Sequence, residues 1–166
     1  MSSTESDSKV LDDPIAEASR QWIAHGWEDA AVGMAAVTTI TRVNRILVAR
    51  IETALGPFGL SFARFEILRL LGFARERQLP MGKIGDRLQV HPASVTSAVR
   101  RLERDGLIKR HPDAHDNRVV LARLLPAGEA ILEEATDRIN EVFIDLEVNH
   151  GRLARVVTTL REIRSW

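Results

Sequence analysis

The chain has 166 residues, 45% of them hydrophobic, and its 23 basic side chains balance its 23 acidic ones. This length and composition are those of a small globular protein with one domain-sized core. The sequence contains no cysteine, which excludes disulfide frameworks, zinc–thiolate sites and thiolate catalysis.

The N-terminal segment MSSTESDSKVLDDP is polar and acidic. It predicts a disordered tail over residues 1–13, because it has too few apolar side chains to pack. A signal peptide would be basic and then apolar, and no apolar run approaches the ~18 residues needed to cross a bilayer. We therefore expect a cytoplasmic location and no membrane partner.

Two helices are predicted over residues 14–57. The first begins at Pro14, which suits the first turn of a helix, after the possible cap Asp13. The second is longer, carries apolar residues at three- and four-residue steps, and ends at Gly56-Pro57. We interpret this segment as an N-terminal extension followed by a dimerisation helix.

The central region, residues 58–125, contains a helix-turn-helix pattern. A helix capped by Ser61 precedes it, a short helix from Met81 to Leu88 opens it, and Pro92 begins its second helix. One face of that second helix is apolar. The opposite face carries Ala93, Thr96, Ser97, Arg100 and Arg104. Small side chains allow close approach to base edges and arginines bind phosphates, so this face is typical of a helix that reads the major groove.

Two strand-like runs, residues 107–110 and 119–124, follow this helix. The loop between them is long for a hairpin and ends with Asp116, Asn117 and Arg118. An arginine at the tip of such a β-wing can enter a narrow minor groove, and a nearby carboxylate can hold its guanidinium in place. The alternative is an ordinary surface hairpin with solvated charges.

Charge is unevenly distributed along the chain. Residues 60–123 hold 13 Lys/Arg against 7 Asp/Glu, whereas the remaining residues hold 10 against 16. A basic centre between acidic ends is expected when the centre neutralises phosphates and the ends have another task. Chance clustering of solvated charges is the alternative.

The last segment, residues 126–166, predicts two further amphipathic helices. Their apolar residues, among them Ile139, Leu160 and Ile163, make more apolar surface than a lone small domain hides. We expect these helices and those near the N-terminus to pack across a two-fold axis in a homodimer. An intramolecular helical bundle is the alternative.

These segments together resemble the MarR family (multiple antibiotic resistance regulator). The matching stretches are Leu60-Ser61 with the following FEIL, then IGDRLQV, SVTSAVRRLERDGLIKR, DAHDNR and LLPAG. The resemblance runs from about Met34 to the C-terminus. It implies a mainly α fold with a small β-wing, in which a winged helix-turn-helix is flanked by N- and C-terminal dimerisation helices.

The resemblance further implies a homodimeric repressor on double-stranded DNA, bound to a pseudo-palindromic operator whose half-sites lie about one helical turn apart. The positions that match the family's DNA-binding residues are Ala93, Ser94, Thr96, Ser97 and Arg100 on the recognition helix, Lys109 and Arg110 on the wing strand, and Asp116 and Arg118 at the wing tip. The sequence departs from the family at Asn117, where many members have a second arginine, and at Leu125, which replaces a threonine cap. A winged-helix module that binds only protein is the alternative function.

A small aromatic or acidic effector is also implied, in a crevice between the dimer helices and the DNA-reading lobe. The helix with Trp22 and Trp27 resembles the extension of the urate-responsive branch. Glu66 stands at that branch's acid position, but Ser97 replaces one of its arginines, so urate itself is not expected. The candidate lining residues are Trp22, His25, Arg50, Arg64 and Glu66. Each has a structural alternative, such as Trp22 in a core and Arg64 in an ion pair.

The sequence contains no catalytic or cofactor motif such as G-x-S-x-G, H-E-x-x-H or a phosphate-binding glycine loop. We therefore expect no enzyme activity and no cofactor. His111 and His115 lie near Asp113 and Asp116, but structural zinc needs four well-placed ligands. We expect DNA or solvent contacts there and no metal.

Overall fold

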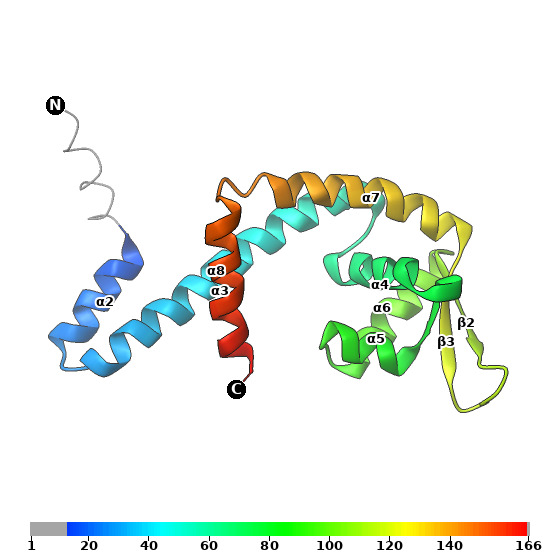
Figure 1. The fold of residues 1–166 in the computed structure, drawn as a ribbon, viewed down its shortest axis with the longest axis horizontal. Helices are drawn as coiled ribbons and strands as arrows, with labels where there is room; N and C mark the ends of the chain where they lie inside the picture. The colour runs from blue at the N-terminus through cyan, green and yellow to red at the C-terminus, as the bar shows by residue number, and fades with distance from the viewer. Residues whose placement is uncertain (1–12, 166) are drawn as a thin grey trace. The chain divides into compact units, whose positions relative to one another are not determined.

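The computed structural model describes residues 13–165, which are mostly helical with one small sheet (Figure 1). The chain divides into two compact units, one ending at Arg50 and one beginning at Ile51, and each is considered by itself. The predicted disordered tail lies outside the described residues, except for Asp13.

The first unit contains helix α2 (Pro14–Ala24) and most of helix α3 (Glu28–Leu55). Asp13 caps α2 as predicted, because its Oδ1 accepts a hydrogen bond of 2.9 Å from the Ile15 N–H. Gly26 joins the two helices with a φ of 81°, a left-handed value that favours glycine. The predicted helices of this segment are confirmed.

The expectation that no segment is long and apolar enough to cross a bilayer is wrong for α3. The segment Glu28–Phe58 is long and apolar enough to span a membrane, with a mean hydropathy of 1.2 over an 18-residue window that is only 6% buried. Length and composition are weak grounds for a membrane span, because helices that pack in a protein interior pass the same test. Arg42 and Arg45 also lie in α3, and an arginine at the centre of a bilayer costs at least ~2.5 kcal/mol.

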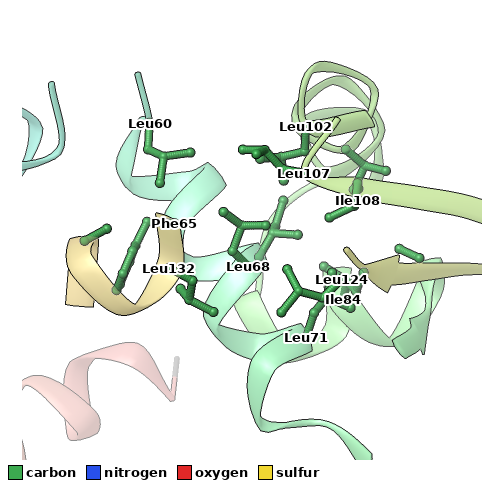
Figure 2. Close-up of a cluster of buried hydrophobic side chains, with 14 of the residues drawn as sticks. Leu60, Phe65, Leu68, Leu71, Ile84, Leu102, Leu107, Ile108, Leu124 and Leu132 are labelled. Atoms are coloured by element: carbon green, nitrogen blue, oxygen red, sulfur yellow. The ribbon is translucent and has the colours of Figure 1, made fainter. Parts of the chain in front are cut away.

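The second unit is built around helix α4 (Phe62–Phe73), which follows the short 3₁₀ turn Gly56–Phe58. The Ser61 hydroxyl caps α4 by accepting a hydrogen bond from the Arg64 N–H. Figure 2 shows the side chains that gather around α4 from the other elements. Fully buried members of this core include Leu68, Leu71, Ile84, Val99, Leu102, Ile108 and Leu132.

The helix-turn-helix consists of α5 (Met81–Leu88), with the predicted bounds, and α6 (Pro92–Arg104), with the predicted start. Gln89 ends α5 in a left-handed conformation, with a φ of 53°. Gly106, with a left-handed φ of 73°, lies just after the C-cap of α6.

The sheet has three antiparallel strands in the order β1-β3-β2, where β1 is Gln78–Pro80, β2 is Ile108–Pro112 and β3 is Val120–Leu124. The hairpin of β2 and β3 is the predicted wing, and its loop stands out from the helices of this unit (Figure 1). The first strand, which follows the short turn Arg75–Arg77, was not predicted. Three residues are too few to show the alternation of a strand.

Helices α7 (Pro126–Ile144) and α8 (His150–Arg164) complete the chain. Leu125 precedes α7 without a side-chain cap, as the sequence predicted. Leu132, Ala135 and Ile139 of α7 are buried, whereas no residue of α8 is. The predicted fold class, a mainly α protein with a small β-wing, is confirmed.

Candidate nucleic-acid interface

Helix α6 begins with a cap that the sequence did not predict. Pro92 occupies the first helical position, and the Nδ1 atom of His91 accepts a hydrogen bond of 3.2 Å from the Ala93 N–H. The Thr96 hydroxyl donates to the Pro92 carbonyl oxygen at 3.0 Å. These bonds order the first turn of the helix, where close contact with base edges is expected.

The two faces of α6 divide as the sequence predicted. Val95, Val99 and Leu102 are buried. The predicted contact residues Ala93, Ser94, Ser97 and Arg100 are exposed, and Thr96 is half-buried. Arg101 and Arg104 are exposed as well. The helix therefore presents small side chains at its start and three cations nearer its end.

The wing loop is closed by Asp113, a role that was not predicted from the sequence. Its Oδ1 accepts hydrogen bonds from the N–H groups of His115 at 2.8 Å and Asp116 at 3.1 Å. Its own N–H donates to the Val119 carbonyl oxygen at 2.9 Å. The side chain of Asp113 thus fixes the course of the loop.

Asp116 and Arg118 are brought together at the wing tip. Asp116 Oδ1 accepts from the backbone N–H of Arg118 at 3.0 Å and from its Nε at 3.2 Å. Hydrogen bonds from the Arg118 side chain and backbone lower the pKa of the Asp116 carboxyl. The Arg118 side chain is nevertheless 92% exposed. The tip therefore holds a cation that is oriented by a carboxylate and accessible to a ligand.

The two basic residues predicted on the wing strand differ in their surroundings. Lys109 is exposed on β2. The guanidinium of Arg110 instead contacts Glu103 of α6, with Nε 2.7 Å and Nη2 2.6 Å from Glu103 Oε2. This contact joins the wing to α6 and leaves Lys109 as the more accessible cation of the pair.

The sheet brings a further base beside Lys109. The strand register pairs Lys109 with Arg123, and Arg123 with Gln78 of β1. Gln78 Oε1 lies 3.0 Å from Arg123 Nε and 3.1 Å from His111 Nε2. Arg123 was not among the predicted DNA-binding residues, because its neighbours on the sheet depend on the unpredicted strand β1.

The predicted effector residues Trp22 and His25 lie in the first unit and meet Trp27. The ring centroids of Trp22 and Trp27 are 5.4 Å apart in an edge arrangement, and those of His25 and Trp27 are 5.6 Å apart and stacked. Arg50, the third predicted residue of this unit, is half-buried on α3.

Arg64 and Glu66, the two candidates on α4, do not share a pocket. Arg64 lines a hollow beside α6 together with Ser97, donates to the Gly59 carbonyl oxygen and pairs with Asp105 at 3.2 Å. Arg64 therefore forms an ion pair, which was the structural alternative to a role in effector binding. Glu66 lines a different groove. Their shared part in an effector pocket stays a prediction.

The groove at Glu66 has a volume of about 270 Å³. Half of its lining residues are aromatic, and the full set is Phe62, Phe65, Glu66, Arg69, Leu70, Phe73, Leu88 and Phe143. Burial raises the pKa of the Glu66 carboxyl. The Arg69 guanidinium lies 4.3 Å from the centroid of the Phe73 ring and donates to the Thr136 hydroxyl at 3.2 Å. The groove thus combines aromatic walls with one acid and one base.

Across residues 13–165, no three His, Asp or Glu side chains gather as a metal-binding group. The His111 ring contacts the Pro112 carbonyl oxygen and Gln78 of β1, and Asp113 accepts from the backbone N–H of His115.

Comparison with known proteins links this geometry to one family. A model of the MarR family matches residues 60–120. The crystal structure of Sco5413, a MarR family transcriptional regulator from Streptomyces coelicolor, is 37% identical and has a TM-score of 0.73, with 80% of this chain and 93% of that chain covered.

Two further similarities are more distant. The HTH-type transcriptional repressor YetL from Bacillus subtilis is 34% identical over 76 residues, 46% of each chain. The structure of Sco3205, a MarR family regulator from Streptomyces coelicolor in complex with DNA, shares the fold at 18% identity and a TM-score of 0.70, over 78% of this chain and 83% of that chain. The chain spans about half the length of YetL and of YdgJ, another regulator from Bacillus subtilis, at 46% and 54%.

Proposed function

The chain belongs to the MarR family, and from this membership we propose that it is a transcription regulator that represses genes by binding double-stranded DNA as a homodimer. One observation carries the proposal: a single lobe presents both a helix with small and cationic exposed residues and a wing tip with an oriented, accessible arginine. These are the parts needed to contact a major groove and the adjacent minor groove together. We propose no enzyme activity, and a cytoplasmic location accords with this role.

Each contact has a proposed part in recognition. Ala93, Ser94, Thr96 and Ser97 approach base edges, because their short side chains let the helix backbone come close. Arg100 and Lys109 bind phosphates beside the helix, and Arg118, oriented by Asp116, enters the minor groove.

A second copy of the chain is the proposed partner of the terminal helices. Helix α8 buries none of its residues, and its apolar side chains Val156, Val157, Leu160 and Ile163 are 40–50% exposed. Helix α3 exposes Val37, Ile40, Val43 and Ile46 at three-residue steps. Apolar stripes of this kind mark association surfaces. Sedimentation without detergent tests this proposal against a membrane association of α3: a dimer supports it, and aggregates that only detergent disperses contradict it.

We further propose that two recognition helices of the dimer read a pseudo-palindromic operator with half-sites about one helical turn apart. Selection of binding sites from random DNA by the purified protein tests this arrangement. Inverted repeats about 10 base pairs apart are expected, and a single asymmetric site would contradict it.

The salt dependence of binding tests DNA recognition against the alternative of a protein-only interaction module. The exposed cations of the lobe release counterions from phosphates, so affinity for the selected DNA should fall roughly 10³- to 10⁵-fold between 50 and 200 mM salt. Affinity that stays flat over this range, or an absence of DNA binding, would favour the protein-only module.

A small aromatic or acidic effector is the proposed signal, and the groove at Glu66 is its proposed site. Aromatic walls suit a flat ring, and Arg69 supplies a positive charge for an acid group. Trp22, His25 and Arg50 stay candidates in the first unit. An effector that prefers one spacing of the two lobes would shift the dimer away from its DNA-competent form. The N-terminal helix with Trp22 keeps its proposed likeness to the urate-responsive branch, although Ser97 argues against urate.

A thermal-shift screen of phenolic acids, urate and acyl thioesters tests the effector. A ligand at 100 times its Kd stabilises the folded protein by ~2.7 kcal/mol. The same compound should release the protein from DNA, and substitution of Glu66 should remove both effects. A compound that stabilises the Glu66 variant equally well binds elsewhere.

A further inference from the structure

Glu103 is the only acid in α6, a helix that otherwise carries three exposed arginines. Both oxygens of its carboxylate bind the same residue of the wing, Arg110. Oε1 accepts a hydrogen bond of 2.9 Å from the Arg110 N–H, and Oε2 lies 2.7 Å from Arg110 Nε and 2.6 Å from Nη2. One side chain of the helix therefore holds both the backbone and the guanidinium of strand β2.

We propose that Glu103 is a positioning residue that sets the angle between the recognition helix and the wing, and that Arg110 serves this positioning instead of contacting DNA. This inference rests on the proposed DNA-binding function. The contact between Glu103 and Arg110 would hold Arg100 on α6 and Arg118 on the wing at the separation that suits adjacent major and minor grooves.

The contacts around the turn explain why Glu103 has this effect. The chain reverses between α6 and β2 at Gly106, and the Leu107 N–H donates to the Leu102 carbonyl oxygen at 2.9 Å. These contacts form the turn, and the base of the hairpin is also held by the pairing of β3 with β1 and by buried side chains such as Ile108 and Leu124. Glu103 adds a direct attachment between α6 and β2, at Arg110, four residues beyond Gly106. This attachment joins the wing to the recognition helix itself, whereas the others join it to β1 and to the hydrophobic core.

The helix itself is braced from its other side. Arg64 of α4 pairs with Asp105, the C-cap residue of α6, at 3.2 Å. Helix α6 is thereby tied to the core helix α4, and the wing is tied to α6 by Glu103. These two ion pairs link the wing to α6 and α6 to the core, in addition to the strand pairing and the buried side chains at the base of the wing.

The environment of the pair distinguishes it from an ordinary surface ion pair. The side chains of Arg110 and Glu103 are only 33% and 31% exposed. Hydrogen bonds from the Arg110 side chain and then from its backbone N–H lower the pKa of Glu103, so this carboxylate stays charged at neutral pH. Because Arg110 neutralises it at short range, the acid does not repel DNA from an otherwise basic helix.

A first experiment measures the wing angle without DNA. The chain has no cysteine, so cysteines introduced at Asn117 on the wing tip and at Ala63, an exposed residue of α4, would be the only sites for spin labels. Labelled protein is mixed with excess unlabelled protein so that only distances within one subunit are measured. We expect a narrow distance distribution in the labelled parent, and a broader one after Glu103→Gln.

The matched control is Glu133→Gln, which removes the same charge from an exposed position of α7. Its distribution should match that of the labelled parent. If Glu103→Gln fails to fold, Arg110→Lys is measured in its place. Lysine keeps the positive charge but lacks the planar fork with which arginine contacts Glu103. A parent-like distribution in the folded variant overturns the proposal.

A second experiment measures whether the angle matters for DNA. Binding to a DNA site selected from a random pool is compared for the wild type, Glu103→Gln, Arg118→Ala and the double variant. We expect Glu103→Gln to weaken binding about tenfold, which is ~1.4 kcal/mol, and Glu133→Gln to leave it unchanged. We also expect the loss caused by Arg118→Ala to shrink in the Glu103→Gln background, because a wing at the wrong angle no longer places Arg118 in the groove.

The outcomes separate the two proposals. If the wild type binds no DNA specifically, the proposed function fails, while the label distances still decide whether Glu103 sets the angle. If the wild type binds and the two substitutions act additively, the proposed function stands and the role of Glu103 in recognition is overturned.

Discussion

Replacement of the wing-tip arginine, Arg118→Ala, tests the proposed interface most directly. The side chain is 92% exposed and packs in no core, so its removal should leave folding and dimerisation intact. An arginine in a DNA groove is worth ~1–3 kcal/mol. A homodimer has two wings, so the loss should reach ~2–6 kcal/mol per operator, or roughly 30- to 10⁴-fold in affinity.

The assay is fluorescence anisotropy with a labelled operator duplex at one fixed salt concentration. The matched control is Arg20→Ala, which removes an exposed arginine of α2 that pairs with Glu17 at 2.5 Å. Both variants lose one positive charge per chain, so a difference between them reports the position of Arg118 and not the net charge. Equal affinities for the two variants would refute the assignment of the wing tip.

Three further predictions concern stability and assembly. Gly128→Ala should destabilise the protein by ~1–3 kcal/mol, because its Cβ would lie 2.2 Å from a backbone carbonyl oxygen, whereas Gly82→Ala, with open space around it, should melt near the wild type in a thermal scan. Replacing Leu160 and Ile163 of α8 with aspartate should convert the dimer to monomer or aggregate, because it buries charge in an apolar interface; a fully dimeric variant in sedimentation would refute this assignment of α8. Glu66→Gln should raise the Tm at pH 7, because burial raises the pKa of the glutamate and disfavours its charged form, and this gain should fade as the pH falls through the raised pKa towards the ordinary value of 4.5; an equal gain at pH 4 and pH 7 would contradict that cause.

Much of the fold could be predicted because its signals are local. Pro92 marks the start of the recognition helix and Gly106 its end, and both act through the conformations that their own residues favour. The strand β1 carries no such signal, because it exists only through its pairing with β3. Short local motifs are therefore visible in a sequence, and short strands that depend on distant partners are not.

The site shows the same division. The pairing of Asp116 with Arg118 was predictable, since the two residues are neighbours in one loop. The partner of Arg110 was not, because Glu103 meets it only after the chain reverses at the turn. The groove at Glu66 was missed as a groove because its walls come from three helices. Residue identity indicates what a side chain can bind, but the tertiary fold decides what is within its reach.

In the wing loop, the residues that fix the backbone conformation differ from the residues that are free to contact a ligand. Its course is fixed by the carboxylates of Asp113 and Asp116, which accept backbone N–H groups, and none of its residues needs a positive φ or a glycine. Ala114, His115 and Asn117 are exposed between these two anchors. Their side chains can therefore be exchanged while the loop keeps its conformation, which makes them natural positions for altering DNA preference by evolution or design.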